Sequence, residues 1–258
     1  MHKPYEKEYA GADTVVIFTH GFMGSPTQFE DLADIAYQHK CSALALLLPG
    51  HGGTSKEFTK YRLHHWERHL ENEIQRMSHV YKNIILVGHS MGGLLSLNAG
   101  LNKNFNIKSI MLISSPLKLR YSLDKVRTGI KLHILSQQTK DDEISEVYKK
   151  SNSIEISSIL NCFSWSRQMA DVYKLMSKTK SNLPAITIPT TIIHSQNDET
   201  VSSKTLKIFS TGFTSAHKIV TLDESRHAFY PPGERTVILR ELACLIAGLD
   251  LNQERKQL

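Results

Sequence analysis

The pattern G-x-S-x-G, filled at residues 88–92 by Gly-His-Ser-Met-Gly, is the clearest chemical signal in this sequence of 258 residues. The run before it, residues 83–88, is typical of a buried strand, and residues 91–101 are typical of a helix. A serine on such a strand–turn–helix corner has a strained backbone that exposes its hydroxyl above the sheet. Glycine is needed on both sides because a side chain there would collide with the adjoining backbone. The pattern therefore predicts Ser90 as a nucleophile.

A serine hydroxyl attacks well only when a base accepts its proton and an acid orients that base. On this kind of turn the chain order is serine, then aspartate or glutamate, then histidine. Asp198 follows a strand-like run at 188–194, and His227 follows another at 217–222. Loops beyond the carboxyl ends of parallel strands are where an open sheet places its site. We therefore predict His227 as the base and Asp198 as the acid that orients it.

Neighbouring carboxylates offer alternatives for the orienting acid. Glu199 and Asp223 are the candidates that compete with Asp198. Asp223 and Glu224 stand too close to His227 in the sequence to orient it easily from a separate loop. Solvated loop carboxylates are therefore the simpler interpretation of these residues.

When a serine attacks a carbonyl group, the carbonyl oxygen becomes negatively charged in a tetrahedral intermediate. Two backbone N–H donors are needed to stabilise that oxygen. One is the amide directly after the nucleophile, here Met91, and the other comes from the loop after the first strand. That loop reads His-Gly-Phe-Met-Gly at residues 20–24. Gly21 allows a close approach, and the amide of Phe22 is the expected second donor. We expect His20 to fix this loop through hydrogen bonds rather than to transfer protons.

Apolar runs and helical periodicities alternate along the chain and position these loops. Strand-like runs occupy 14–19, 41–48, 83–88, 107–114, 188–194 and 217–222, and helix-like segments occupy 26–40, 62–81, 91–101, 202–211 and 234–249. The alternation predicts an α/β fold with a mostly parallel sheet of about six or seven strands, covered by helices on both faces. We expect a single domain over 1–258, with a helical lid inserted at 117–182, because that polar stretch is too long for an ordinary connection.

The sequence resembles the α/β-hydrolase superfamily in His20-Gly21-Phe22, Gly50-His51-Gly52, the G-x-S-x-G pattern with Gly93 after it, Asp198 and His227. The resemblance covers roughly residues 13 to 250 and is strongest to small bacterial carboxylesterases and monoacylglycerol lipases. It implies the α/β-hydrolase fold, a triad of Ser90, Asp198 and His227, an oxyanion hole formed by the amides of Phe22 and Met91, and a lid at the insertion. Only about 13 residues precede the first buried strand, so the usual leading antiparallel hairpin must be reduced or missing.

The expected function is hydrolysis of a small-molecule carboxylic ester through an acyl-enzyme intermediate, with no metal or organic cofactor. The candidates for the substrate pocket are Phe22, Phe163, Trp165 and Met169. A thioesterase, a peptidase or a carbon–carbon bond hydrolase would use the same triad, because this fold hosts all of these reactions. A ligand receptor without catalysis is the alternative from another class, but it has no reason to keep Ser90, Asp198 and His227 together.

Other features argue against metal and nucleic-acid sites. His65 and His69 share a helix face, but the pattern is H-x-E-x-H rather than the metal-binding H-E-x-x-H, and no third ligand is evident. The formal net charge of +6 comes from dispersed basic residues, whereas nucleic-acid binders cluster them. No apolar run approaches the ~18 residues needed to cross a bilayer, and no signal-peptide pattern is evident. We therefore expect no nucleic-acid partner, no membrane insertion, a cytoplasmic location and a monomer or homodimer.

Overall fold

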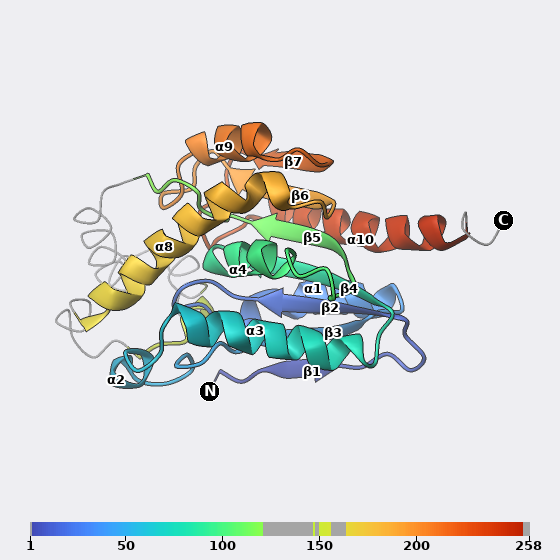
Figure 1. Ribbon diagram of the computed structural model, residues 1–258, viewed down its shortest axis with the longest axis horizontal. Coiled ribbons are helices and arrows are strands. Elements are labelled where there is room, and N and C mark those ends of the chain that lie inside the picture. Colours follow the sequence, from blue (N-terminus) through green and yellow to red (C-terminus); the bar gives the residue numbers. More distant parts are fainter. Residues whose placement is uncertain (1, 121–146, 148–149, 156–163, 255–258) are drawn as a thin grey trace.

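Seven strands form one sheet in the computed structural model, which describes residues 2–120, 147, 150–155 and 164–254 (Figure 1). The strands are β1 (Tyr5–Lys7), β2 (Thr14–Thr19), β3 (Ser42–Leu46), β4 (Asn83–His89), β5 (Ile107–Ile113), β6 (Thr190–Ser195) and β7 (His217–Leu222). Their order across the sheet is β1-β3-β2-β4-β5-β6-β7. Within these described strands, β1 is antiparallel to β3 and the other neighbouring pairs are parallel. The predicted mostly parallel sheet is confirmed.

The chain ahead of β2 contributes one short strand to the sheet. β1 has three residues and pairs with β3, with Tyr5 opposite Ala45. Its charged side chains form ion pairs: Lys7 pairs with Asp34 at 2.5 Å, and Glu6 pairs with Arg76 at 3.3 Å. The described residues ahead of β2 therefore hold one short antiparallel strand.

Strand β2 explains why the predicted strands are apolar throughout rather than alternating. All six of its residues are buried. Val15 and Ile17 belong to the core on one face of the sheet, whereas Val16 and Phe18 belong to the core on the other. Because helices cover both faces, every position of the strand leaves water on folding and favours an apolar residue.

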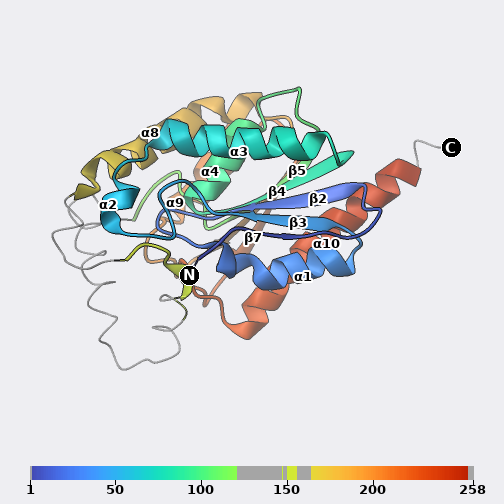
Figure 2. The same cartoon turned by 90° about the horizontal axis from the view of Figure 1, so that it is seen from below.

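Helices form a layer on each face, as Figure 2 shows. One layer contains α3 (Leu63–Ser78), α4 (Met91–Ala99), α8 (Ser166–Asn182) and α9 (Lys204–Gly212), and the other contains α1 (Glu30–Gln38) and α10 (Pro232–Glu254). Shorter helical turns are η1 (Pro26–Phe29), α2 (Ser55–Phe58) and η2 (Leu183–Ala185). The buried face of α3 follows the predicted spacing of Trp66, Leu70, Ile74 and Met77. In the described ranges, no helix combines the length and the apolar character that a membrane span requires.

Helix α8 is the described carboxyl-terminal part of the stretch predicted as a lid, and it is fixed to the helical layer of the sheet. Its Asp171 carboxylate accepts hydrogen bonds from the Arg62 guanidinium at 2.5 and 2.9 Å and from the Leu63 amide at 3.1 Å. Thr179 accepts a hydrogen bond from Asn98 of α4 at 2.7 Å. Much of the predicted lid lies outside the described residues, so the lid stays a prediction.

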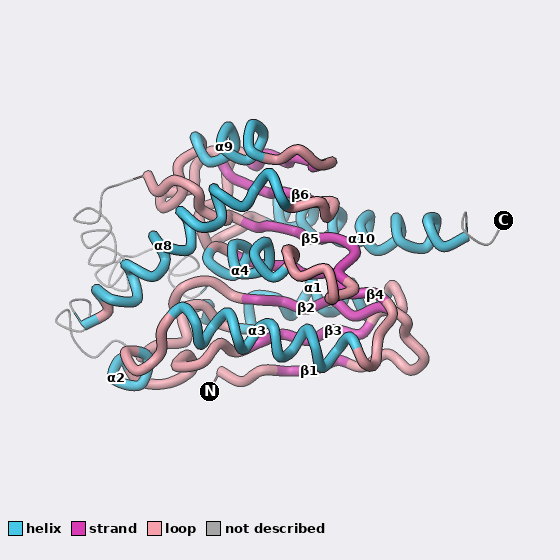
Figure 3. Tube along the Cα trace, viewed as in Figure 1, coloured by secondary structure: helices cyan, strands magenta, loops and turns pink. Residues whose placement is uncertain are grey.

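Because β2 to β7 are parallel, their carboxyl ends lie at the same end of the sheet, and the loops between the strands and helices can be followed in Figure 3. The register places Thr19 of β2 beside Gly88 of β4, and Ser195 of β6 beside Leu222 of β7. The loops that follow β2, β4, β6 and β7 leave the sheet at these ends. Four segments that are far apart in the sequence are therefore neighbours in space, which is the usual position of a site in such a sheet.

Candidate active site

The turn between β4 and α4, here called the elbow (residues 88–92), forces Ser90 into an unusual backbone conformation. Ser90 has φ 51° and ψ −121°, in a region that residues other than glycine rarely adopt. A Cβ on Gly92 would lie 2.0 Å from the backbone oxygen of Thr19, and one on Gly88 would lie 2.4 Å from Gly93. The two glycines are thus required by the close packing of this turn, and the predicted strand–turn–helix context is confirmed.

Ser90, His227 and Asp198 form one hydrogen-bonded line. The Ser90 Oγ lies 3.0 Å from Nε2 of His227, and Nδ1 of His227 lies 2.9 Å from Oδ2 of Asp198. The Asp198 side chain is fully buried, and its other oxygen accepts hydrogen bonds from the amides of Thr200 at 2.8 Å and Val201 at 2.7 Å. With Nδ1–H donating to the carboxylate, Nε2 is left to accept the serine proton. The fold thus brings together the three residues that were predicted from separate loops.

Opposite charges shift the pKa of both titrating groups in this line. Burial by itself would lower the pKa of His227, but the Asp198 carboxylate raises it above its ordinary value, with a further contribution from Glu199. Burial opposes the ionisation of Asp198, yet the charge of His227, the hydrogen bond between them and two backbone amides hold the Asp198 pKa below its ordinary value. The arrangement therefore favours an imidazolium beside a carboxylate, the charge state that follows proton transfer from the serine.

The backbone of His227 is held as firmly as its ring. Its carbonyl accepts a hydrogen bond from Nε2 of His89 at 2.8 Å and another from the Tyr230 hydroxyl at 3.0 Å. Its amide donates to the Glu199 carboxylate at 3.1 Å. Glu199 therefore contacts the backbone of His227, while Asp198 contacts the ring. Burial and the neighbouring His227 lower the pKa of His89 to about 3, so His89 is neutral and its Nε2–H is the donor.

The loop after β2, here called the oxyanion loop (residues 20–24), approaches Ser90 closely. A Cβ on Gly21 would lie 2.8 Å from the Cβ of Ser90, so glycine is needed there. His20 is fully buried; its Nδ1 donates to the Gly21 carbonyl at 2.9 Å, and its Nε2 accepts from the Leu48 amide at 3.0 Å. Burial lowers the pKa of His20 well below its ordinary value, so the ring is neutral and holds the loop through these two hydrogen bonds. The expectation that His20 fixes the loop is confirmed.

An aromatic cluster extends from the oxyanion loop. The Phe22 ring lies 5.2 Å from Phe58 and 6.4 Å from Trp66, and the Phe58 ring lies 5.8 Å from Trp165. Two of the predicted pocket residues, Phe22 and Trp165, are therefore joined through Phe58, which the sequence reasoning did not select. Met169 is half-buried on α8, where its amide donates to the Trp165 carbonyl at 2.8 Å. The fourth predicted pocket residue, Phe163, lies outside the described residues.

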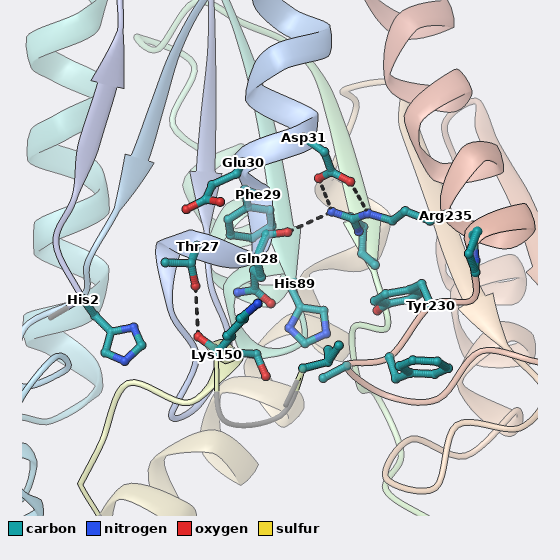
Figure 4. Close-up of a pocket in the computed structure, with 16 residues that line it drawn as sticks. His2, Thr27, Gln28, Phe29, Glu30, Asp31, His89, Lys150, Tyr230 and Arg235 are labelled. Carbon is teal, nitrogen blue, oxygen red and sulfur yellow. Dashed lines mark hydrogen bonds and ion pairs between the residues drawn. The ribbon is translucent and has the colours of Figure 1, made fainter. Parts of the chain in front are cut away.

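A cavity of about 660 Å³ is bordered by residues that follow His227 in the sequence, among them Tyr230 (Figure 4). His89, Ala228, Phe229 and Tyr230 line it. The Arg235 guanidinium, 5.6 Å from the centre of the Tyr230 ring, also lines the cavity and binds Asp31 and the backbone oxygen of Gln28. This cavity therefore lies beside the first turns of α1 and α10.

One histidine of α3, His65, has a structural role at the start of the helix. His65 accepts a hydrogen bond from the Arg62 amide at 3.0 Å through its Nδ1 and so caps the start of the helix. In the part of the chain that the structure describes, no group of three or more metal-ligating side chains is gathered. The residues of α3 thus offer no observation in favour of a metal.

Proteins similar to this chain are named esterases and lipases. The thermostable monoacylglycerol lipase of Bacillus sp. (strain H-257) is 25% identical over 222 residues, which cover 82% of each chain. The carboxylesterase of Bacillus subtilis (strain 168) is 20% identical over 257 residues, which cover 96% of this chain and 97% of that one. A solved structure from work on the metagenome-derived lipolytic enzymes LipS and LipT has a TM-score of 0.75 at 19% identity, covering 95% and 97% of the two chains. The structural similarity establishes the fold.

The sequence profile of one family, described as serine aminopeptidase, S33, matches residues 10–231. The matched range is the greater part of the chain and contains the oxyanion loop, the elbow, Asp198 and His227. The sheet order and the hydrogen-bonded line at its carboxyl edge agree with that match. The chain therefore belongs to this family of α/β-hydrolases, and it is a hydrolase whose relatives are esterases and lipases.

Proposed function

We propose that the chain hydrolyses carboxylic esters of small molecules, with Ser90 as nucleophile, His227 as general base and acid, and Asp198 as the residue that orients His227. The observation that carries the proposal is the line from the Ser90 hydroxyl through the imidazole to a buried carboxylate, with distances of 3.0 and 2.9 Å. The esterases and lipases among the relatives support an ester bond as the target.

In the first half of the reaction, the Ser90 Oγ attacks the carbonyl carbon of the ester while its proton passes to Nε2 of His227. The carbonyl oxygen becomes an oxyanion, which we assign to the backbone amides of Phe22 and Met91. Loss of one such donor typically costs about 3 kcal/mol of transition-state stabilisation. His227 then donates its proton to the leaving oxygen, the bond to that oxygen breaks, and the alcohol departs. The acyl group remains as an ester on Ser90.

In the second half, a water molecule attacks the acyl carbon and gives a proton to His227. The same two amides accept the new oxyanion. Its collapse breaks the bond between the acyl carbon and the Ser90 Oγ, which takes the proton back from His227, and the carboxylic acid leaves. Asp198 stays ionised throughout and stabilises the imidazolium in both halves, in keeping with its lowered pKa.

For the acyl chain we propose the region of the aromatic cluster beside Phe22, with contributions from Trp165, Met169 and Phe163. The contact from Phe22 through Phe58 to Trp165 supports this assignment, because Phe22 belongs to the loop that approaches Ser90. One methylene in an apolar pocket is worth only ~1–3 kcal/mol. We therefore expect a graded preference among acyl chain lengths rather than a sharp one.

A second candidate is aminopeptidase activity, which the description of the matched family favours. The same residues would attack a peptide carbonyl, and His227 would protonate the departing amine. The choice between an ester and an amide substrate needs a direct test.

The test is hydrolysis of p-nitrophenyl esters from acetate to palmitate by the wild type and by Ser90→Ala, with aminoacyl p-nitroanilides and acyl thioesters in parallel. We expect ester hydrolysis in the wild type, and a loss on the order of 10⁶-fold in kcat for the variant. Equal activity in both proteins would remove Ser90 as the nucleophile. Faster turnover of the anilides or thioesters would move the assignment to a peptidase or a thioesterase. The cytoplasmic location and the monomer or homodimer stay predictions from the sequence.

A further inference from the structure

The loop that carries His227, here called the His loop (residues 223–227), ends close to the first turn of α10, where Glu234 lies. One oxygen of the Glu234 carboxylate accepts hydrogen bonds from the amides of Asp223 at 2.6 Å and Glu224 at 3.0 Å. The other oxygen accepts from the Ser225 amide at 2.7 Å and from the Ser225 hydroxyl. A single side chain thus holds three consecutive backbone amides of the His loop.

Three successive amides that point to one group form an anion-binding concavity, for which an ionised carboxylate is the matching occupant. Burial would raise the pKa of Glu234, but the Ser225 hydroxyl and the three amides hold it below its ordinary value. The start of a helix also favours a negative charge. Glu234 is therefore a carboxylate at any pH at which His227 can act as a base.

The same part of the His loop also contacts the loop that carries Asp198, here called the Asp loop (residues 195–199). The Ser195 hydroxyl donates to the Ser225 carbonyl, and the Asn197 side chain donates to the Asp223 carbonyl at 2.6 Å. Glu234 therefore fixes the segment that adjoins the Asp loop on one side and His227 on the other. A shift of this segment would change the distances from the imidazole to both of its partners.

We propose that Glu234 is a positioning residue for the hydrolysis: its carboxylate fixes residues 223–225 so that the imidazole of His227 stays between Ser90 and Asp198. The proposal rests on the proposed function of Ser90, His227 and Asp198. Ester hydrolysis is sensitive to such placement because a shift of about 1 Å in a reacting group can cost on the order of 100-fold in rate.

The neighbouring residue provides a matched control. Arg235 lies on the same turn of α10, and its guanidinium binds the Asp31 carboxylate at 2.6 and 2.7 Å and the Gln28 carbonyl at 2.8 Å (Figure 4). These bonds attach α10 to η1 and α1, not to the His loop. Removing them weakens the attachment of the same helix without touching residues 223–225.

The experiment compares Glu234→Ala, Glu234→Gln and Arg235→Gln with the wild type. It measures kcat and KM on one p-nitrophenyl ester, the rate at which a fluorophosphonate probe labels Ser90, and the thermal unfolding temperature. We expect kcat and the labelling rate of Glu234→Ala to fall by roughly 10- to 100-fold with little change in KM. Glu234→Gln keeps one accepting oxygen and should lose less. Arg235→Gln should unfold at a lower temperature and lose less kcat than Glu234→Ala, because its hydrogen bonds lie away from residues 223–225 and its contact with the Tyr230 ring, at 5.6 Å, leaves the Tyr230 hydroxyl on His227.

Chemical rescue separates positioning from general weakening of the fold. Glu234→Ala leaves the three amides open, so added formate or acetate should occupy them and raise kcat, with no such effect in Arg235→Gln. A loss of kcat that no carboxylate restores, or an equal loss in Arg235→Gln, would overturn the proposal. If the wild type reacts with the fluorophosphonate but hydrolyses no ester, the proposed function fails, and the labelling rates and their rescue still decide the role of Glu234.

Discussion

The elbow and the His loop both hold a group of the proposed triad, but they are held by different forces. At the elbow the force is steric exclusion: a side chain at Gly92 would come within 2.0 Å of the backbone oxygen of Thr19 in β2, and one at Gly88 within 2.4 Å of Gly93. The His loop is held instead by hydrogen bonds: its amides donate to the carboxylates of Glu199 and Glu234, and the His227 carbonyl accepts from His89 and Tyr230. His89 is 138 residues away from His227 in the sequence. The elbow is therefore fixed by close packing of backbone against backbone, and the His loop is fixed by hydrogen bonds with several separate segments.

This difference determines how each region responds to substitution. Sterically fixed backbone has no substitute for a missing glycine, so a single methyl group disrupts it. A loop held by several hydrogen bonds loses one bond at a time, and each neutral bond contributes about 0.5–1.5 kcal/mol to stability. We therefore expect abrupt effects at the elbow and graded effects around the His loop.

Gly92→Ala should have the largest effect. The added Cβ meets backbone atoms of Thr19 and His20, which cannot move without displacing β2, so the cost should exceed the ~1–3 kcal/mol of ordinary overpacking. We expect little folded protein and no activity, as measured by soluble yield and thermal unfolding. Gly53→Ala is the control, because a Cβ there would lie 4.0 Å from its nearest neighbour, Glu57. A Gly92→Ala protein with the unfolding temperature of the wild type would contradict the steric account.

Asp198→Asn should have the next largest effect, on activity rather than on folding. The amide cannot stabilise an imidazolium and would select the wrong tautomer of His227, so kcat should fall roughly 10⁴-fold. Steady-state kinetics with a p-nitrophenyl ester would measure the loss. Asp223→Asn is the matched control, because the Asp223 carboxylate accepts a hydrogen bond from Gln196 rather than from the imidazole. Comparable losses of kcat in the two variants would mean that Asp198 is not the carboxylate that orients His227.

The pH dependence of kcat/KM should reveal the charges around His227. Protonated His227 cannot accept the serine proton, so activity falls as the pH decreases through its pKa. Asp198 and Glu199 raise that pKa, whereas burial of the ring opposes them. Glu199→Gln removes one of these charges, and the acidic limb of the profile should therefore move to lower pH. Glu71→Gln removes the same charge from an exposed position on α3 and should leave the limb in place. A limb that moves to higher pH in Glu199→Gln would contradict the assignment.

Tyr230→Phe should have the smallest effect. It deletes one of the two hydrogen bonds to the His227 carbonyl and leaves the one from His89. A neutral hydrogen bond contributes about 0.5–1.5 kcal/mol. If all of this free energy is lost from the transition state, kcat should fall by about two- to twelvefold. Kinetics of this variant alone and combined with Glu234→Gln would show whether the contacts of the His loop act independently. A drop as large as that of Asp198→Asn would mean that the loop does not respond in graded steps.

The same contrast explains what the sequence could reveal. Ser90 was identifiable because steric exclusion requires glycine at fixed spacing around it. Asp198 and His227 were identifiable because they follow apolar strands, whose ends a parallel sheet brings together. No sequence pattern singles out Glu234 or Tyr230: Glu234 binds amides of residues 223–225, and Tyr230 binds the His227 carbonyl, through contacts that form only when the chain has folded. No local pattern records such a partner.

The aromatic cluster shows a second limit of sequence reasoning. Phe22 was a candidate because it belongs to the oxyanion loop, but Phe58 lies on a single helical turn, α2, too short to show any periodicity. Helix α8 shows the opposite case. Its helical character was foreseen, whereas its fixed position depends on an ion pair between Arg62 and Asp171, which are 109 residues apart. Contacts of that kind become visible only when the chain has folded.

The short strand β1 has a consequence for the behaviour of many copies of the chain together. Strand β3 has only small and apolar side chains apart from Ser42, and without β1 its outer backbone groups would be open to pairing with another chain. β1 covers that edge with three residues, of which Glu6 and Lys7 are charged and held in ion pairs with helices on opposite faces of the sheet. Charged, short edge strands resist edge-to-edge aggregation. These few residues, remote from Ser90, thus protect the sheet from self-association.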